Sequence, residues 1–457
     1  MSPSPAPILS PSATPEVNPK IIVLDDDPTG SQTVHSCLLL TRWDVPTLCL
    51  GLTDPAPIFF VLTNTRALNP EAAATVTQEV CHNLKLAIAA VGITDFLVVS
   101  RSDSTLRGHY PVETDVIAAE LGGFDAHFLV PAFFEGGRFT KQSVHYLVVN
   151  GVPTPVHETE FAKDSVFGYS TSYLPDYAEE KTQGRIKAAT VERFLLPQIR
   201  AGVGPRLMGL QGNVCCAVDA ENQADLNQFA AAILRAASQG KRFLFRSAAS
   251  LLTALAQLPP QPIAAQAMAA YKPTKAPGVV IVGSHVQKTT EQLTALLQMP
   301  NVAAVEVPVA DLLAGTTDAD LGVQITAQIA QHHQEGKTAV VYTSRQELTF
   351  ADVATRLDFG QRVSALLMAI VQQLPADIGF LISKGGITSN DVVSTGLALP
   401  TARLLGQILA GCSVIRTPED HPRFPNLPVV LFPGNVGDAQ ALATVYARLA
   451  DLPQELS

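Results

Sequence analysis

Short apolar runs, separated by stretches with helical spacing, recur along the chain from residue 20 onward. Runs without polar alternation are typical of strands buried on both faces of a parallel sheet. They predict strands at Ile21–Leu24, Ile58–Leu62, Phe96–Val99, Phe128–Val130, Val279–Val282, Ala339–Tyr342, Ile378–Ile382 and Val429–Phe432. The spacing predicts helices at Asn69–Val91, Thr289–Gln298, Asp318–Gln334, Gly360–Gln373 and Ala439–Leu449. We therefore expect an α/β protein, with two α/β domains whose largely parallel sheets face a shared cleft.

Proline-rich segments divide this pattern. Residues 1–19 are rich in Pro, Ser and Ala and are expected to form a disordered tail. A second proline-rich stretch, 259–277, is the best linker candidate, although a short helix fits within it. The expected domains are therefore 20–258 and 278–457.

Composition narrows the class of protein. The 457 residues suffice for two or three domains, 47% are apolar, and only 16% are charged, against an average of about 25%. The net charge of −10 and the lack of a basic stripe argue against nucleic acid as a partner. No apolar run approaches the roughly 20 residues that span a membrane, and the six cysteines include no Cys-x-x-Cys pair, so a cytoplasmic location is expected. The sequence is compatible with a homodimer.

Polar clusters follow the predicted strands of the first half. Three adjacent carboxylates, Asp25, Asp26 and Asp27, come directly after the first strand, where their repulsion needs a compensating group. The next two strands are followed by residues with hydroxyl, amide, carboxylate and guanidinium groups, namely Asn64, Arg66, Arg101, Asp103, Ser104 and Arg107. Parallel strands bind ligands at their carboxyl ends. This set of groups suits a small, polyhydroxylated anion, with arginine for a carboxylate and aspartate for hydroxyls.

The same aspartates permit another interpretation. Asp25-x-Asp27-x-Thr29 matches the pattern of haloacid-dehalogenase-type phosphatases, in which the first Asp is the nucleophile and the second a general acid/base. These phosphatases also need a Ser or Thr after a strand, a Lys and a Gly-Asp pair. Ser100, Lys384 and Gly437-Asp438 could supply them, but their spacing along the chain fits that pattern poorly. This phosphatase remains the alternative function.

Small residues follow the strands of the second half. Gly385 and Gly386 let a backbone approach an anion, and the Ser and Thr residues after them precede a helix-compatible stretch. Ser284 and Gly434 lie in similar small-residue turns. These turns favour a nucleotide-phosphate site, and Lys384 could neutralise phosphate charge. Within the first half, after its fourth predicted strand, the aromatic and charged stretch Val148–Gly184 predicts either a lid or an ordinary surface insertion.

Taken together, three motifs resemble those of the four-carbon acid sugar kinase family: Asp26-Asp27-Pro28-Thr29-Gly30, Asp103-Ser104-Thr105-Leu106-Arg107-Gly108 and Lys384-Gly385-Gly386-Ile387-Thr388. The resemblance covers nearly all of residues 20–450. It implies an acid-sugar-binding α/β domain over 20–258, an ATP-binding α/β domain over 278–457, and phosphorylation of a substrate such as threonate, erythronate or 3-oxo-tetronate. The third aspartate, Pro28 and the Val148–Gly184 segment depart from the usual pattern.

The resemblance also implies roles for individual residues. It places substrate contacts at Asp26, Asp27, Arg101, Asp103, Ser104 and Arg107, and ATP contacts at Ser284, Gly360 and Gly385, Gly386, Ile387 and Thr388. On this hypothesis Mg²⁺ accompanies ATP, with its protein ligands unassigned. Arg101 and Arg107 hold the carboxylate, and Asp27, or less favourably Asp26, orients or deprotonates the attacking hydroxyl. A non-catalytic sugar-acid-binding protein is the third alternative.

Overall fold

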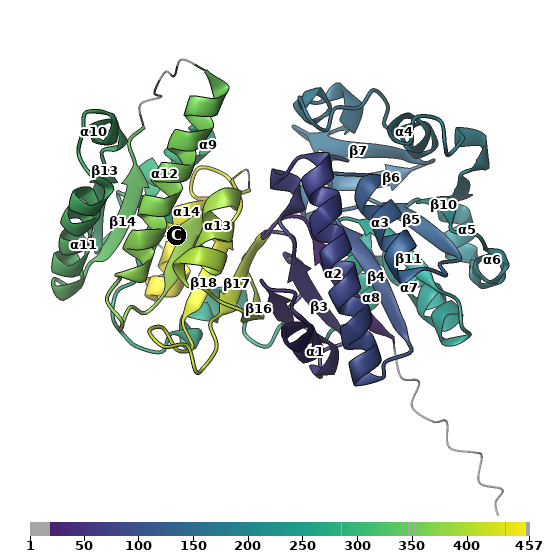
Figure 1. Ribbon diagram of the computed structural model, residues 1–457, viewed down its shortest axis with the longest axis horizontal. Helices are drawn as coiled ribbons and strands as arrows, with labels where there is room; N and C mark the ends of the chain where they lie inside the picture. The colour runs from purple at the N-terminus through teal and green to yellow at the C-terminus, as the bar shows by residue number, and fades with distance from the viewer. Residues whose placement is uncertain are drawn as a thin grey trace, which may run out of the picture.

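The computed structural model describes residues 19–453 except 285, 346, 347, 349, 351 and 435. The tail expected over residues 1–19 lies, apart from Pro19, outside the described residues. Figure 1 shows two lobes side by side, one from each half of the chain, with strands β16 and β17 at their junction.

The described strands form a 15-stranded mixed sheet that runs through both lobes. All neighbours are parallel in the N-terminal lobe, in the order β2 (Leu38–Leu40), β3 (Ile58–Leu62), β1 (Lys20–Asp25), β4 (Phe96–Arg101), β11 (Phe243–Ser247), β5 (Ala126–Val130), β10 (Val214–Val218) and β9 (Glu192–Phe194). The C-terminal lobe contributes β13 (Val302–Val307), β14 (Thr338–Thr343), β12 (Val279–Val282), β15 (Leu381–Lys384) and β18 (Pro428–Phe432), also parallel, then β17 (Cys412–Arg416) and β16 (Thr401–Leu409), which run antiparallel. The expected α/β class with largely parallel strands is confirmed.

The two lobes meet where β16 pairs with β2. Leu38, Leu39 and Leu40 oppose residues 401–403 in antiparallel register. Beyond the ladder, the Ser36 amide donates to the Leu404 carbonyl at 2.7 Å, and the Leu404 amide donates to the Cys37 carbonyl at 2.8 Å. Backbone hydrogen bonds therefore fix how the lobes sit relative to each other, so two sheets that we expected separately are one sheet.

Alternation along the buried strands decides which helices cover each face. Ile21 and Val23 belong to the largest core cluster, which extends into both lobes and includes residues of α5 (Leu196–Ala201), α6 (Gly204–Gly209), α7 (Gln223–Ser238), α8 (Ala249–Ala256), α10 (Val309–Leu313), α11 (Asp318–Gln334) and α12 (Val353–Gln372). Ile22 and Leu24 point the other way, toward α1 (Val45–Thr53), α2 (Pro70–Val91) and α3 (Val112–Leu121). In the C-terminal lobe Val280 and Val282 pack against α9 (Gln287–Leu296) and α14 (Ala441–Ala450). Each sheet face is therefore covered by helices.

A small antiparallel sheet stands apart from the main one. It consists of β6 (Arg138–Lys141), β7 (Val144–Val149) and β8 (Val152–Pro155), and lies with α4 (Leu174–Lys181) along one edge of the N-terminal lobe (Figure 1). Part of the Val148–Gly184 segment thus has regular structure. In the stretch 259–277, a 3-10 helix over Ala265–Tyr271 buries Met268 in the C-terminal core. Among the described residues, no helix has both the length and the apolar character that a membrane span requires.

Candidate functional site

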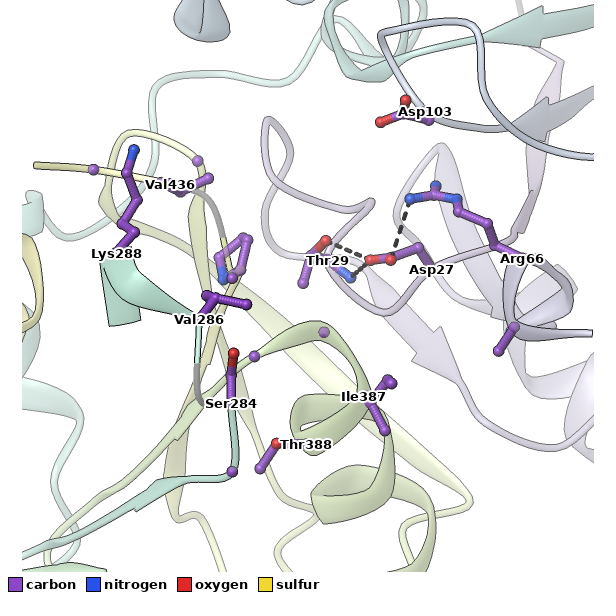
Figure 2. A pocket seen from close by; sticks show the side chains of 18 of the residues that line it. Asp27, Thr29, Arg66, Asp103, Ser284, Val286, Lys288, Ile387, Thr388 and Val436 are labelled. Atoms are coloured by element: carbon purple, nitrogen blue, oxygen red, sulfur yellow. Dashed lines mark hydrogen bonds and ion pairs between the residues drawn. The ribbon is translucent and has the colours of Figure 1, made fainter. Parts of the chain in front are cut away.

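A cavity of about 1820 Å³ lies between the lobes and takes its walls from both. The expected site residues that line it are Asp27, Asn64, Arg66, Arg101, Asp103, Ser104, Arg107, Ser284, Gly360, Gly385, Gly386, Ile387 and Thr388. Asp26 and Lys384 were expected there too, but neither lines it. In Figure 2, Asp27, Thr29, Arg66 and Asp103 lie on one side, and Ser284, Lys288, Ile387 and Thr388 lie on the other.

The end of β1 separates the three aspartates into different environments. Asp25 and Asp26 are almost completely buried, whereas the Asp27 side chain is 21% exposed. The chain then turns so closely that a Cβ on Gly30 would lie 2.0 Å from Asp25 Oδ1. A residue without a side chain is therefore required at Gly30, and the turn directs Asp27 into the cavity.

Two arginines and one serine compensate the buried carboxylates. Arg101 Nη1 lies 3.2 Å from Asp25 Oδ1. Arg66 pairs with Asp26 through Nη2 and donates from Nε to Oδ2 at 3.2 Å, while Ser102 Oγ donates to Asp26 Oδ2 at 2.8 Å. These contacts occupy both oxygens of Asp26, so its role in the structure is to hold Arg66 in place.

Asp27 is the aspartate that faces the other lobe. The Thr29 amide donates to its Oδ1 at 2.8 Å, and Arg66 Nη1 donates to its Oδ2 at 3.2 Å (Figure 2). Burial opposes ionisation, but Arg66 and Arg101 outweigh it and keep the pKa of Asp27 below its usual value. A Cβ on Gly386 would come within 3.7 Å of Asp27 Oδ2. The carboxylate is therefore ionised and lies beside the glycine turn of the C-terminal lobe.

The loop after β4 forms the adjoining wall. Arg107 Nε donates to Asp103 Oδ2 at 2.9 Å, and the Thr105 amide donates to the same oxygen at 3.2 Å. Burial disfavours the ionised form of Asp103, yet Arg66 and Arg107 hold its pKa well below the usual range. Arg107 also lies over the Phe161 ring, with its guanidinium carbon 4.9 Å from the ring centroid. Phe161 belongs to the Val148–Gly184 segment and lines the cavity, so this segment contributes directly to the site.

The C-terminal wall is built from short turns. Gly385 has φ +116°, a conformation that L side chains rarely adopt, and it connects β15 to α13 (Gly386–Asp391). A Cβ on the neighbouring Gly283 would come within 2.4 Å of Thr388 Oγ1. The two turns thus pack together without side chains between them and leave backbone and small polar groups facing the cavity.

The expected role of Lys384 does not fit its position. Its side chain is fully buried, and Nζ donates to the Pro433 carbonyl at 2.6 Å and to the Gly434 carbonyl at 3.3 Å. Burial lowers its pKa to about 7. Lys384 therefore stabilises the turn at Pro433 through hydrogen bonds to its backbone carbonyls. Lys288, at the start of α9, does line the cavity.

Sequence reasoning did not assign a role to Arg138, which also lines the cavity. The two glycines before it were visible in the sequence, but no strand was predicted at Arg138–Lys141, where β6 lies. That no described carboxylate lies within ion-pair distance of it depends on packing and could not be read from the sequence. Among the described residues, no group of three or more His, Cys, Asp or Glu side chains is arranged to hold a metal ion by itself.

The geometry does not favour the phosphatase alternative. Its nucleophile, Asp25, is fully buried and is not part of the cavity wall. Its lysine, Lys384, is buried in the opposite lobe. A nucleophile must reach the phosphorus atom of its substrate, which Asp25 cannot do in this arrangement.

Curated relatives with kinase activities resemble this chain. It is 24% identical over 396 residues to the D-erythronate kinase of Heliobacterium modesticaldum, covering 80% of this chain and 83% of the relative. It is 30% identical over 165 residues to the D-threonate kinase of Bordetella bronchiseptica, covering 34% of this chain and 38% of that protein.

Solved structures share the fold. A Salmonella typhimurium LT2 protein, provisionally named a tRNA synthase, has a TM-score of 0.68 at 21% identity and covers 96% of this chain and 100% of its own. A Haemophilus influenzae protein from a family named as a domain of unknown function has a TM-score of 0.64 at 17% identity, covering 94% and 100%. At these identities the likeness concerns the fold alone.

Two family matches together span most of the sequence. Residues 21–255 match a family described as the sugar-binding N-terminal domain, and residues 279–442 match one described as the nucleotide-binding C-terminal domain. The first match alone covers more than half of the 457 residues. With both domains in this order, and with the cavity between them, the chain belongs to the four-carbon acid sugar kinase family.

Proposed function

We propose that the protein is an ATP-dependent kinase that phosphorylates a hydroxyl of a four-carbon sugar acid, such as a tetronate or 3-oxo-tetronate. The observation that carries this proposal is the approach of the Asp27 carboxylate to the Gly385–Gly386 turn across the cavity. A kinase needs a hydroxyl acceptor and a phosphate-binding turn close together. The names of the two curated relatives support a sugar acid as the acceptor.

In this proposal each lobe has one ligand. The lobe formed by residues 20–258 binds the sugar acid through its strand-end residues, and the lobe formed by residues 278–457 binds ATP. The turns at Ser284 and Gly385 through Thr388 leave room for phosphate oxygens, and Gly360 lies in the same wall on α12. Residues 259–277 link the two.

Mg²⁺ would be expected to arrive with the phosphates of ATP, where it offsets their negative charge. Such an ion takes one or two protein carboxylates and keeps several waters. Asp391 and Asp438 both line the cavity from the C-terminal lobe and have suitable oxygen ligands. These two residues are therefore our candidates for its protein contacts.

Asp27 would bind the attacking hydroxyl. Its low pKa keeps it ionised at neutral pH, so it can accept a hydrogen bond and direct a lone pair of the hydroxyl oxygen toward the phosphorus. Phosphoryl transfer depends mainly on positioning and electrostatics, and a weak base is sufficient for it. Water is excluded from the reaction if the lobes close over their ligands.

The direct test is ADP release by the purified protein with Mg-ATP and a panel containing erythronate, threonate and their 3-oxo derivatives. We expect at least one acid to stimulate ADP release and ATP to raise the melting temperature by mass action. Phosphate release from phosphate esters without ATP would instead support the phosphatase. Binding of an acid without turnover in either assay would support the non-catalytic alternative.

Asp27→Asn should lower kcat by roughly 10²- to 10⁴-fold, because the amide cannot accept the hydroxyl proton. The KM for ATP should change little, since the side chain belongs to the opposite lobe. Steady-state ADP release measures both quantities, and a thermal melt checks folding. An Asp27→Asn enzyme with wild-type kcat would contradict the assigned role.

Gly385→Ala should weaken ATP binding roughly 5- to 150-fold, since an L residue at φ +116° costs on the order of 1–3 kcal/mol or displaces the turn. Sugar-acid affinity should stay near the wild-type value. Isothermal titration with each ligand separates the two effects. Gly209→Ala is the matched control, because its φ is ordinary and an added Cβ meets nothing within 4 Å. Unchanged ATP affinity in Gly385→Ala would argue against a phosphate site at this turn.

Asp25→Asn tests whether this aspartate is structural. Burial raises the pKa of Asp25 to about 7, above its unfolded value near 3.8, so between these pH values the folded protein holds a proton that the unfolded chain releases. Rising pH over this window therefore removes up to about 1.4 kcal/mol of stability per pH unit through this group. In Asp25→Asn that loss is absent.

Denaturant unfolding of both proteins from pH 4 to 8 measures the difference. The stability of Asp25→Asn relative to the wild type should rise with pH, and its turnover should fall less than that of Asp27→Asn. A stability difference that is constant over this range would show that Asp25 is already ionised in the folded protein.

A further inference from the structure

Arginines of the N-terminal lobe that line the cavity differ in their ion pairs. Arg66 pairs with Asp26 and Asp27, Arg101 pairs with Asp25, and Arg107 pairs with Asp103. Arg101 Nη1 also lies 3.9 Å from Asp26 Oδ1, so each of these guanidiniums already has an aspartate partner in the protein. Arg138 lines the same cavity, and no carboxylate among the described residues lies within ion-pair distance of it.

The backbone before β6 is shaped to hold this side chain. Arg138 Nη1 donates to the Gly136 carbonyl at 2.5 Å, and its guanidinium carbon lies 5.9 Å from the centroid of the Phe133 ring. A Cβ on Gly136 would lie 2.1 Å from Nη1. The glycine is therefore what allows the arginine to fold back against its own turn, and the guanidinium is positioned before any ligand binds.

Part of the guanidinium is left without a partner. The Nε atom is buried and has no hydrogen-bond acceptor among the described residues. Arg101 Nε is in the same state, but Arg101 has ion-pair partners. A buried cationic donor without an acceptor is costly, and a water, an ion or a ligand can satisfy it. Burial also lowers the pKa of Arg138, but an arginine stays protonated at neutral pH.

We propose that Arg138 binds the carboxylate of the sugar acid and is the residue that selects acids over uncharged polyols. This inference rests on the proposed function, and it moves the carboxylate contact from Arg101 and Arg107 to Arg138. The planar fork of an arginine matches the two oxygens of a carboxylate. Arg101 then holds Asp25, and Arg107 holds Asp103. Asp103, which lines the cavity, can accept hydrogen bonds from substrate hydroxyls.

Isothermal titration of D-erythronate and D-threonate into the protein without ATP tests this role. Arg138→Met should weaken binding of the acid by roughly 10- to 150-fold. Arg138→Lys should lose less, because it keeps the charge but not the fork. Gly136→Ala should mimic Arg138→Met by displacing the guanidinium. Binding of the corresponding alditols, which lack the carboxylate, should be unchanged in all three variants.

Arg242→Met is the matched control. Arg242 also donates to a backbone carbonyl, that of Leu121 at 3.3 Å, lies over Phe96 and Phe124, and is outside the cavity. Its substitution should leave acid affinity at the wild-type value. Thermal melts of all variants exclude unfolding as the cause of any loss.

Three results separate the possible failures. Wild-type affinity for the acids in Arg138→Met would overturn the carboxylate site. An equal or larger loss of ATP affinity in Arg138→Met would also overturn it and assign the arginine to the nucleotide phosphates. Acid binding that depends on Arg138, in a protein that never releases ADP, would leave the carboxylate site standing and refute the kinase.

Discussion

The antiparallel pairing of β2 with β16 is the interaction on which the site depends. Its backbone hydrogen bonds, together with the ion pair of Arg403 with Asp54, join the lobes at the middle of the sheet. Asp27 belongs to one lobe and Gly386 to the other, and their approach requires this junction. A flexible linker alone would leave that distance free to vary.

Charge compensation decides what each aspartate of the triplet can do. Asp25 is buried with one oxygen unpartnered, and its raised pKa reflects that burial. Asp26 has both oxygens occupied by Arg66 and Ser102. Asp27 is held by Thr29 and Arg66 but remains partly open to the cavity. The same residue type therefore serves as a buried spacer, an anchor for Arg66 and a ligand-facing carboxylate, because the number of donors around each carboxylate differs.

The sequence predicted the elements whose signal is local. Continuous apolar runs located β1, β3 and β4 closely, whereas the run predicted at Ile378–Ile382 forms its strand three residues later, at Leu381–Lys384. The junction was missed, since β2 has only three residues and β16 mixes polar with apolar positions. Lys384 was assigned to phosphate because it precedes two glycines, but it is the last residue of a buried strand and its side chain lies over Phe432. The direction of a side chain and its ion pairs depend on packing between distant segments. The roles of Lys384 and Arg138 therefore could not be predicted from the spacing of residues in the sequence.

A protein with a net charge of −10 repels an anionic substrate overall, so selective binding of an acid needs a local positive charge. In the N-terminal lobe, the wall residues Asp27 and Asp103 pair with Arg66 and Arg107, and Asp25 and Asp26, which do not line the cavity, pair with Arg101 and Arg66. A cation that is already neutralised contributes little to the binding of a second anion. Arg138 adds a positive charge at one point of the wall that forms no ion pair with a described carboxylate, although Asp103 and Glu160 attract it at longer range. An acid bound there has its carboxylate held by Arg138, so that its hydroxyls remain available to Asp27, which lines the same cavity. Both the position of the bound acid and its affinity therefore depend on Arg138, the cavity arginine that forms no ion pair with a described carboxylate.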